Sequence, residues 1–268
     1  MAKKRISRVF ALLGLLVIVV ASGCSGGAPP SPTPAPAPQG RHDLDMKPMV
    51  REYFAQAPED WNLISSQQVL NTRPLIVDVR QPEEYGKGFI EGSVNIPLAE
   101  LARSLSALPA MDKEIVLVCS TGHRSTVGMM VLQFLGYKNA KSLAGGMTDW
   151  QAAKLPVVTA PISKRPSGPA PKIDPDLQAT LDFYLNEIQQ VDWGRISPAA
   201  LTEDRKLKSS AEQEIQPETF DQGPSLLVDV DSADAYGQAN LSKAMNIALR
   251  ELPGSLDTLP LDKMVLWA

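Results

Sequence analysis

The chain has 268 residues, of which 44% are hydrophobic and 21% are charged, and its formal net charge is −4. This length is enough for two modest domains. The acidic balance argues against nucleic-acid binding, which needs Lys and Arg side chains to neutralise phosphates.

The first 23 residues have the order of a secretory signal peptide, with a basic end, an apolar run over residues 9–21 and small residues before Cys24. They carry four positive charges and no acid, so removing them from the total of −4 leaves the rest of the chain at −8. The apolar run is shorter than the roughly 20 residues of a membrane span.

The small residues followed by Cys24 resemble a bacterial lipobox, with Ala21 in place of the more usual Leu. This resemblance implies cleavage before Cys24 and attachment of lipid to that residue. We therefore expect a lipid-anchored protein of the bacterial cell envelope, on the extracytoplasmic side. The alternatives are an uncleaved anchor and ordinary secretion. Residues 24–43 are rich in Pro and Ala, which predicts an extended tether that lifts the folded part off the membrane.

Residues 44–158 are predicted to form a first folded domain, in which apolar strands alternate with helices. Continuous apolar runs are typical of parallel strands that are covered on both faces. The order of the elements predicts an α/β fold, with an open parallel sheet and helices on both faces. The predicted strands are 75–79, 94–97, 115–118 and 141–143, and the predicted helices are 44–57, 65–70, 82–85, 98–108 and 126–137.

Cys119 follows one of these strands directly, at the edge where ligands bind in such sheets. A cysteine between a strand and the start of a helix faces backbone N–H groups that have no helical partner. Those donors and the helix dipole stabilise an anion, which predicts a nucleophilic thiolate. Gly122 lets the loop turn, and Arg124 adds a positive charge. The alternative is a buried structural cysteine, since free Cys packs well as a small hydrophobe.

The motif Cys119-x-x-Gly122-x-Arg124-Ser125 resembles the active-site loop of rhodanese-type sulfurtransferases. Further segments similar to that family stand in the same order within residues 60–158. They are 75–80, 82–85, 88–97 and 143–147, followed by Trp150 and 155–157. Phe89 is a departure, because the family usually has His at that position.

The resemblance implies a rhodanese-like fold and sulfur transfer through a persulfide on Cys119, with no metal and no organic cofactor. A small anionic sulfur donor such as thiosulfate would load the cysteine, and a thiol or cyanide would accept the sulfur. The residues that would bind the substrate and the persulfide are Ser120, Thr121, Gly122, His123, Arg124 and Ser125.

Two charged residues after the strand 75–79 have two interpretations. Asp78 and Arg80 could support the active site directly. We favour a structural role, in which Asp78 accepts bonds from loop N–H groups and Arg80 pairs with Glu83 or Glu84, since charges at strand ends are usually paired. His123 could act as a base, but we expect it to face solvent.

A second copy of the pattern follows a predicted linker at residues 159–175. Residues 226–230 match 75–79 at an offset of 151, and the same offset aligns Asn246 with Asn95. Trp193 matches Trp61 at an offset of 132, so the second copy holds an insertion of 19 residues around 203–224. Residues 176–268 are thus predicted to form an incomplete rhodanese-like repeat without the active-site Cys.

Two other functions remain open. The active-site loops of the related phosphatases and arsenate reductases have a spacing similar to Cys-x5-Arg. The spacing here is Cys-x4-Arg, which disfavours both of those activities. The chain could also be a non-catalytic sulfur carrier or partner-binding module, with the degenerate repeat as the docking surface.

Overall fold

The computed structural model describes residues 36–41, 43–159, 171–190, 193, 225–230, 232–238, 245–258 and 264–267. The predicted signal peptide, Cys24, most of the tether and the insertion around 203–224 lie outside these residues. Within the described part of the chain, no helix has both the length and the apolar character that a bilayer crossing requires.

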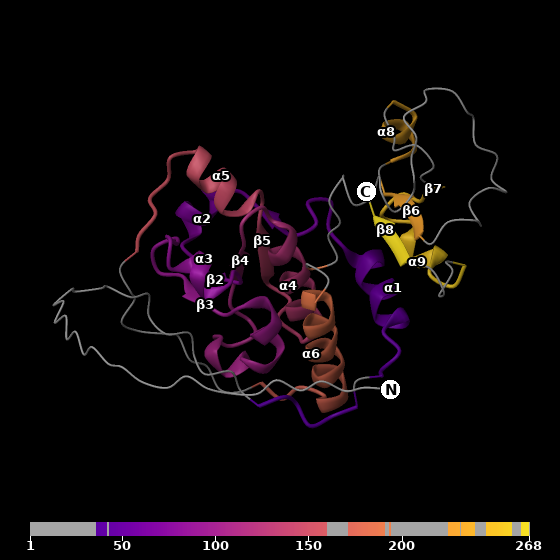
Figure 1. The fold of residues 1–268 in the computed structure, drawn as a ribbon, viewed down its shortest axis with the longest axis horizontal. Coiled ribbons are helices and arrows are strands. Elements are labelled where there is room, and N and C mark those ends of the chain that lie inside the picture. Colours follow the sequence, from indigo (N-terminus) through magenta and orange to yellow (C-terminus); the bar gives the residue numbers. More distant parts are fainter. Residues whose placement is uncertain are drawn as a thin grey trace, which may run out of the picture.

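The first unit is built on a sheet of five parallel strands in the order β1-β5-β4-β2-β3 (Figure 1). This arrangement confirms the predicted open parallel sheet. β4 lies at its centre, between β5 and β2, and its carboxyl end leads to Cys119. The strands are β1 Leu63–Ile64, β2 Leu75–Asp78, β3 Val94–Asn95, β4 Ile115–Val118 and β5 Ala140–Leu143.

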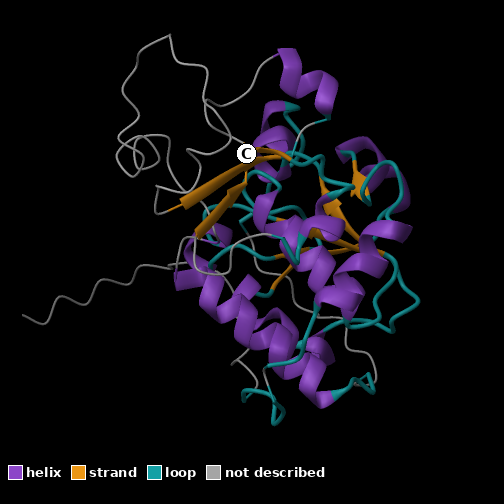
Figure 2. Cartoon of the chain, turned by 90° about the vertical axis from the view of Figure 1, so that its right-hand side faces the viewer, coloured by secondary structure: helices purple, strands orange, loops and turns teal. Residues whose placement is uncertain are grey.

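Helices lie on both sides of the strands, as Figure 2 shows. Ser65 begins α2 with a capping box, in which its hydroxyl accepts from the Gln68 N–H group. This confirms the predicted start of that helix. The helices are α1 Lys47–Gln56, α2 Ser66–Thr72, α3 Pro82–Tyr85, η1 Leu98–Arg103, η2 Leu105–Ala107, α4 His123–Phe134, α5 Gly146–Ala152 and α6 Pro175–Gln190.

The two faces of the sheet bury alternate residues of each strand. On β4, Ile115 and Leu117 pack with η1, α4 and α6, and Cys119 belongs to the same cluster. Val116 and Val118 face the other side, where they pack with Met147 and Trp150 of α5. The side-chain period of two along a strand therefore places Cys119 on the face that α4 and α6 cover.

The single helix predicted over residues 98–108 is divided into two in the structure. The segment forms two 3-10 helices, η1 and η2, separated at Ser104. Leu98 and Leu101 are three residues apart, as are Leu105 and Leu108, and all four side chains are buried. Three residues per turn place such pairs on one side, so a 3-10 helix directs them into the core as well as an α-helix would.

A second sheet has three parallel strands in the order β7-β6-β8, with β6 Ser225–Asp229, β7 Met245–Asn246 and β8 Met264–Trp267. Val228 pairs with Met245 here, as Val77 pairs with Val94 in the first sheet, and both residues are shifted by 151. These registers agree with the predicted repeat. The helices α8 Ala233–Gln238 and α9 Leu252–Ser255 accompany this sheet.

Each unit also contacts a helix from the other half of the chain. α6 packs on η1 of the first unit, and α1 packs on α9 of the second. Figure 1 shows α1 between α4 and the second sheet. The Lys47 Nζ atom lies 2.8 Å from Asp257 Oδ1, and the Arg250 guanidinium lies 4.6 Å from the centre of the Trp61 ring. Each unit thus packs against a helix that the other half of the chain supplies, α6 for the first unit and α1 for the second.

Candidate active site

Cys119 lies at the carboxyl end of β4, where the sheet meets the start of α4. Its Sγ atom accepts a hydrogen bond from the Gly122 backbone N–H group at 3.2 Å, and the Ser125 hydroxyl lies 3.5 Å away. The Gly122 N–H group would stabilise a thiolate at this position more than a thiol. The single Ser125 hydroxyl proton can point to Sγ or to the Gly122 carbonyl oxygen, which lies 2.9 Å from Ser125 Oγ. The residue is only 1% exposed. A donor therefore reaches Sγ only if groups that cover it move.

The loop reverses direction at Gly122, which has a φ of +101°. Residues with a Cβ rarely adopt this conformation, which explains the glycine. The Gly122 carbonyl accepts bonds from the Thr126 N–H group and hydroxyl, each at 3.0 Å. The Ser142 hydroxyl of β5 donates to Ser125 Oγ at 2.8 Å and holds Ser125 beside the sulfur.

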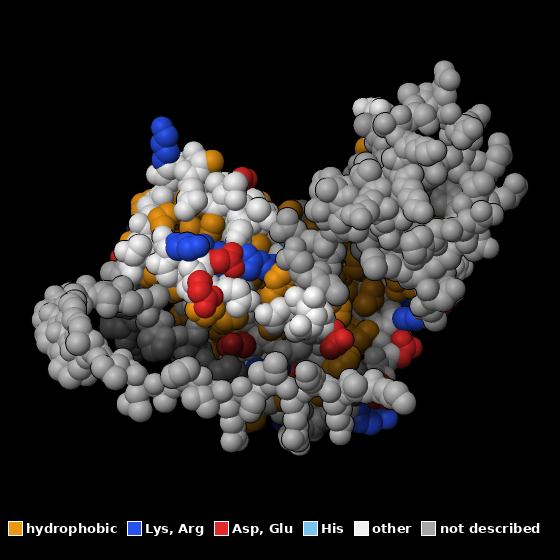
Figure 3. Space-filling view, viewed as in Figure 1, with side chains coloured by type: hydrophobic (Ala, Val, Ile, Leu, Met, Phe, Trp, Pro, Cys, Tyr) orange, Lys and Arg blue, Asp and Glu red, His pale blue; other side chains and the backbone are white. Residues whose placement is uncertain are grey.

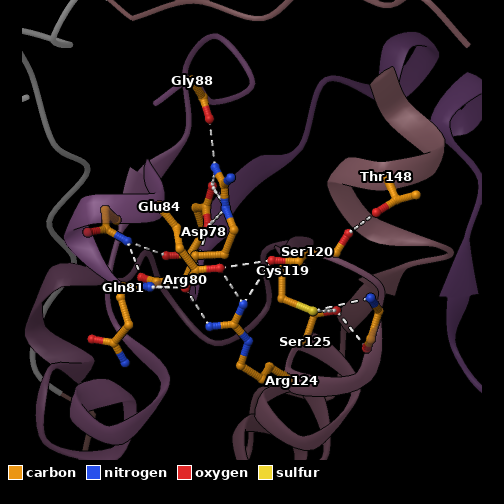
Figure 4. A network of polar contacts seen from close by, with 12 residues as sticks. Asp78, Arg80, Gln81, Glu84, Gly88, Cys119, Ser120, Arg124, Ser125 and Thr148 are labelled. Atoms are coloured by element: carbon orange, nitrogen blue, oxygen red, sulfur yellow. Dashed lines mark hydrogen bonds and ion pairs between the residues drawn. The ribbon is translucent and has the colours of Figure 1, made fainter. Parts of the chain in front are cut away.

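The start of α5 supports the loop from the other side of the sheet edge. The Met147 N–H group donates to the Cys119 carbonyl at 2.8 Å, and the Thr148 N–H group donates to the Ser120 carbonyl at 2.9 Å. The Thr148 hydroxyl also donates to the Ser120 carbonyl at 2.9 Å, as Figure 4 shows. A Cβ on Gly146 would lie 2.4 Å from the Cys119 carbonyl oxygen, and its φ is +57°. Sequence reasoning placed a turn at Gly146 but missed both α5 and its contacts with the loop.

Arg124 points away from the sulfur and toward α3, as Figure 4 shows. Its guanidinium forms a bidentate pair with the Glu84 carboxylate, with both N–O distances at 2.7 Å. It also donates to the Ser120 hydroxyl at 2.9 Å, and that hydroxyl donates to Glu84. The Arg124 hydrogen bonds lower the pKa of Glu84 from 4.5 to about 2, although partial burial opposes the shift. From the sequence, Glu84 is predicted only as a possible partner of Arg80.

The predicted pairing of Arg80 with Glu83 or Glu84 is wrong. Arg80 instead pairs with Asp78, at 2.6 Å between Nη2 and Oδ2, and donates to the Gly88 carbonyl at 2.8 Å. Two residues along an extended chain return to the same side, so Asp78 is nearer to Arg80 than either glutamate. Burial raises the pKa of Asp78, and the Arg80 hydrogen bonds oppose that shift. The two side chains hold the end of β2, and Figure 4 shows the Arg80 guanidinium directed toward Gly88.

A pocket of about 380 Å³ opens beside the loop. The His123 Nε2 atom lies 2.9 Å from the Trp193 carbonyl oxygen. Because a carbonyl only accepts, Nε2 carries the proton and is not available as a base. The pocket residues are Gln81, Glu84, Ser120, Thr121, His123, Arg124 and Trp193.

The predicted loop residues therefore fall into two groups. Gly122 and Ser125 contact the sulfur, whereas Ser120, Thr121, His123 and Arg124 line the pocket beside it. On the molecular face in Figure 3, acidic and basic side chains lie next to one another. Among the residues that the structure describes, no group of three or more His, Cys, Asp and Glu side chains is placed to hold a metal ion.

Comparison with known proteins yields a match to the rhodanese-like domain over residues 59–153. The chain is 34% identical over 80 residues to the thiosulfate sulfurtransferase PspE of Escherichia coli, covering 30% of this chain and 76% of that protein. A crystal structure of a rhodanese-related protein from Thermoplasma volcanium is 32% identical, with a TM-score of 0.35. That match covers 37% of this chain and 98% of the other.

A Bacillus subtilis protein whose name describes a sulfur carrier is 37% identical over 111 residues. The match covers 41% of this chain and 56% of that protein, so the chain spans little more than half of this relative. The segment that matches the family model, residues 59–153, includes the Cys119 loop of the first unit. The chain belongs to the rhodanese-like family.

Proposed function

We propose that the chain is a sulfurtransferase that carries sulfane sulfur as a persulfide on Cys119. The observation that carries this proposal is the position of Sγ, which accepts the Gly122 N–H group and lies beside the Ser125 hydroxyl at the end of a central strand. The family supports the same chemistry, since relatives of this chain are named as sulfurtransferases.

In the first step, the Cys119 thiolate attacks the outer sulfur of thiosulfate. The new bond joins Sγ to that sulfur, and the bond between the two sulfurs of thiosulfate breaks with its electron pair, so that sulfite leaves. The persulfide keeps one negative charge, which the Gly122 N–H group and the Ser125 hydroxyl are placed to stabilise. In the second step, cyanide or a thiolate attacks the outer sulfur of the persulfide, and Cys119 leaves as a thiolate. The kinetics should be ping-pong.

The Glu84–Arg124 ion pair has no net charge, and this changes the role expected for Arg124, which was to bind the anionic donor. Two of its donors bind Glu84 and one binds Ser120, so its charge is balanced before any donor arrives. Arginine has five N–H donors, which leaves it able to bind an anion at the pocket as well. We therefore assign Arg124 first to holding the loop and second to orienting the donor.

The test is persulfide formation measured by mass spectrometry in a Cys24→Ser chain, where Cys119 is the single thiol. Incubation with thiosulfate should add about 32 Da, the mass of one sulfur atom. The same chain with Cys119→Ser is the matched control and should stay unmodified. A wild-type loop that gains no mass at any thiosulfate concentration would overturn the proposal.

A second measurement, of thiocyanate release, distinguishes an enzyme from a sulfur carrier. The name of the Bacillus relative suggests the carrier as the second candidate. With excess thiosulfate and cyanide, an enzyme releases many equivalents of thiocyanate for each chain. A carrier that only a partner protein can load releases about one equivalent of thiocyanate from a preloaded persulfide and then stops, because thiosulfate does not reload it.

We further propose that Cys24 is lipid-modified and anchors the protein outside the cytoplasm, and that the second unit is a degenerate repeat. Residues 1–24 support the first statement through the order of basic, apolar and small residues, and the matched strand registers support the second. Metabolic labelling with a fatty-acid analogue should modify the wild type but not Cys24→Ser. Equal labelling of both chains would contradict lipidation at Cys24.

A further inference from the structure

Helix α6 covers the face of the first sheet on which Cys119 lies, although it belongs to the chain after the linker. The Arg103 guanidinium of η1 pairs with the Asp182 carboxylate of α6 at 2.6 and 2.7 Å. The Gln178 side chain donates to the Ala102 carbonyl at 2.7 Å. Leu181 and Leu185 are 4% and 0% exposed and share a cluster with Cys119. The catalytic face is therefore completed by residues outside the segment 59–153 that matches the family.

Trp193 follows α6 and reaches the pocket beside the Cys119 loop. It is 8% exposed, and its carbonyl accepts the His123 Nε2–H group at 2.9 Å. It lines the pocket together with Glu84 and Arg124. The other residues of that wall are polar or charged, so Trp193 is the large apolar side chain among those lining the described pocket.

The first half of the chain has an equivalent residue that faces the other way. Trp61 and Trp193 each follow an Asp, and both have a left-handed φ, of 53° and 61°. Trp61 lies against Arg250 of the second unit, whereas Trp193 lies at the pocket of the first. The left-handed backbone conformation therefore does not distinguish Trp193 from Trp61. What distinguishes Trp193 is its place at the pocket beside the Cys119 loop.

We propose that Trp193 determines which sulfur donors reach Cys119, so that the second half of the chain sets the specificity of the first. This inference rests on the proposed sulfurtransferase function. Cys119 is 1% exposed and is not among the residues that line the pocket of about 380 Å³, so a donor that enters this pocket reaches the sulfur only past the side chains of its wall. Glu84 and Arg124 are fixed by their ion pair, and His123 is fixed by the Trp193 carbonyl. The indole is the one bulky wall that substitution can remove without leaving a charge unpaired.

The experiment compares two donors that react at the same kind of bond and differ in size, thiosulfate and benzenethiosulfonate, with cyanide as the acceptor. The ratio of kcat/KM for benzenethiosulfonate to kcat/KM for thiosulfate is measured in the full chain. The variants are Trp193→Ala, Trp193→Phe and, as the matched control, Trp61→Ala. Trp193 is uncharged, so the charge difference between the donors cancels when the ratio is compared with that of the wild type.

Removing the indole should raise the ratio about tenfold in Trp193→Ala, the size of effect that pocket contacts usually have. Trp193→Phe should raise it about threefold, and Trp61→Ala should leave it within about twofold of the wild type. Thermal melts establish that each variant is folded, and if Trp193→Ala does not fold, the Phe variant decides.

Two failures are distinguishable. A wild type that forms no persulfide with either donor overturns the proposed function and this inference with it. An active wild type in which the Trp193 variants change both donors by the same factor overturns this inference alone. An equal shift in Trp61→Ala would likewise overturn it, because the effect would then come from packing between the units.

Discussion

Replacing Glu84 by Gln tests whether its ion pair with Arg124 stabilises the active-site loop. The change removes one charge and keeps the size of the side chain. A pKa lowered from 4.5 to about 2 corresponds to about 3.4 kcal/mol for the ionised carboxylate. The Glu84 side chain is 33% exposed, so screening by solvent reduces this to about 1–2 kcal/mol. The melting temperature should fall by about 3–6 °C at pH 7.

The effect should depend on pH in a defined direction. The folded-state pKa of Glu84 lies below its unfolded value, so its contribution is complete above pH 4.5 and is lost as the pH falls through about 2. The difference in melting temperature between wild type and Glu84→Gln should therefore be constant from pH 7 to about 5 and shrink below it. Calorimetry at several pH values measures this directly.

The matched control is Glu83→Gln, which removes the neighbouring, exposed carboxylate. It should change the melting temperature by less than about 1 °C, as is usual for a surface substitution. Equal melting temperatures for Glu84→Gln and wild type at pH 7 would refute the reasoning. So would a difference that persists unchanged at pH 3, because it would not come from the ionised carboxylate.

Three further substitutions test the supports of the site. Gly146→Ala should lower persulfide formation at least about tenfold, because a Cβ at this position meets the Cys119 carbonyl. Gly92→Ala is the control for backbone strain, because Gly92 also has a positive φ but a Cβ there meets open space. Asp182→Asn should destabilise the chain by about 2–3 kcal/mol in urea melts, since it leaves the partly buried Arg103 charge without its carboxylate partner. Asp78→Asn should remove the charged partner of Arg80 and lower the free energy of unfolding by a comparable amount. An unfolding midpoint in urea equal to that of the wild type would contradict the structural role of the pair.

The strands and the nucleophilic loop could be predicted because their signals are local. The apolar runs of β2 and β4 are contiguous, and Cys119, Gly122 and Ser125 stand within seven residues. β1 was missed because a two-residue strand carries no periodic pattern. The division of the 98–108 segment at Ser104 could not be predicted, because its leucine spacing fits both one α-helix and two 3-10 helices.

The partners of charged residues could not be predicted from the sequence in the same way. Glu84 and Arg124 are 40 residues apart, and Arg103 and Asp182 are 79 apart. Such pairs depend on how the chain folds over itself, and several carboxylates were available to each arginine. The contact of Trp193 with the first unit has the same origin, because a repeat alignment shows which residues are equivalent but not which unit each residue packs against.

The balanced charge of Arg124 has a consequence for how the loop stabilises an anion. If Glu84 neutralises the guanidinium, the net positive charge near Sγ is small, and stabilisation must come mainly from the direction of N–H and O–H groups. Those directions depend on the backbone from Cys119 to Gly122, which Met147 and Thr148 hold through the carbonyls of Cys119 and Ser120. Reactivity should therefore be more sensitive to changes in α5 than to neutralising substitutions at the ion pair. A larger effect of changes in α5 than of changes at the ion pair would indicate a preorganised loop, whereas the reverse would indicate a site that stabilises the anion by net charge.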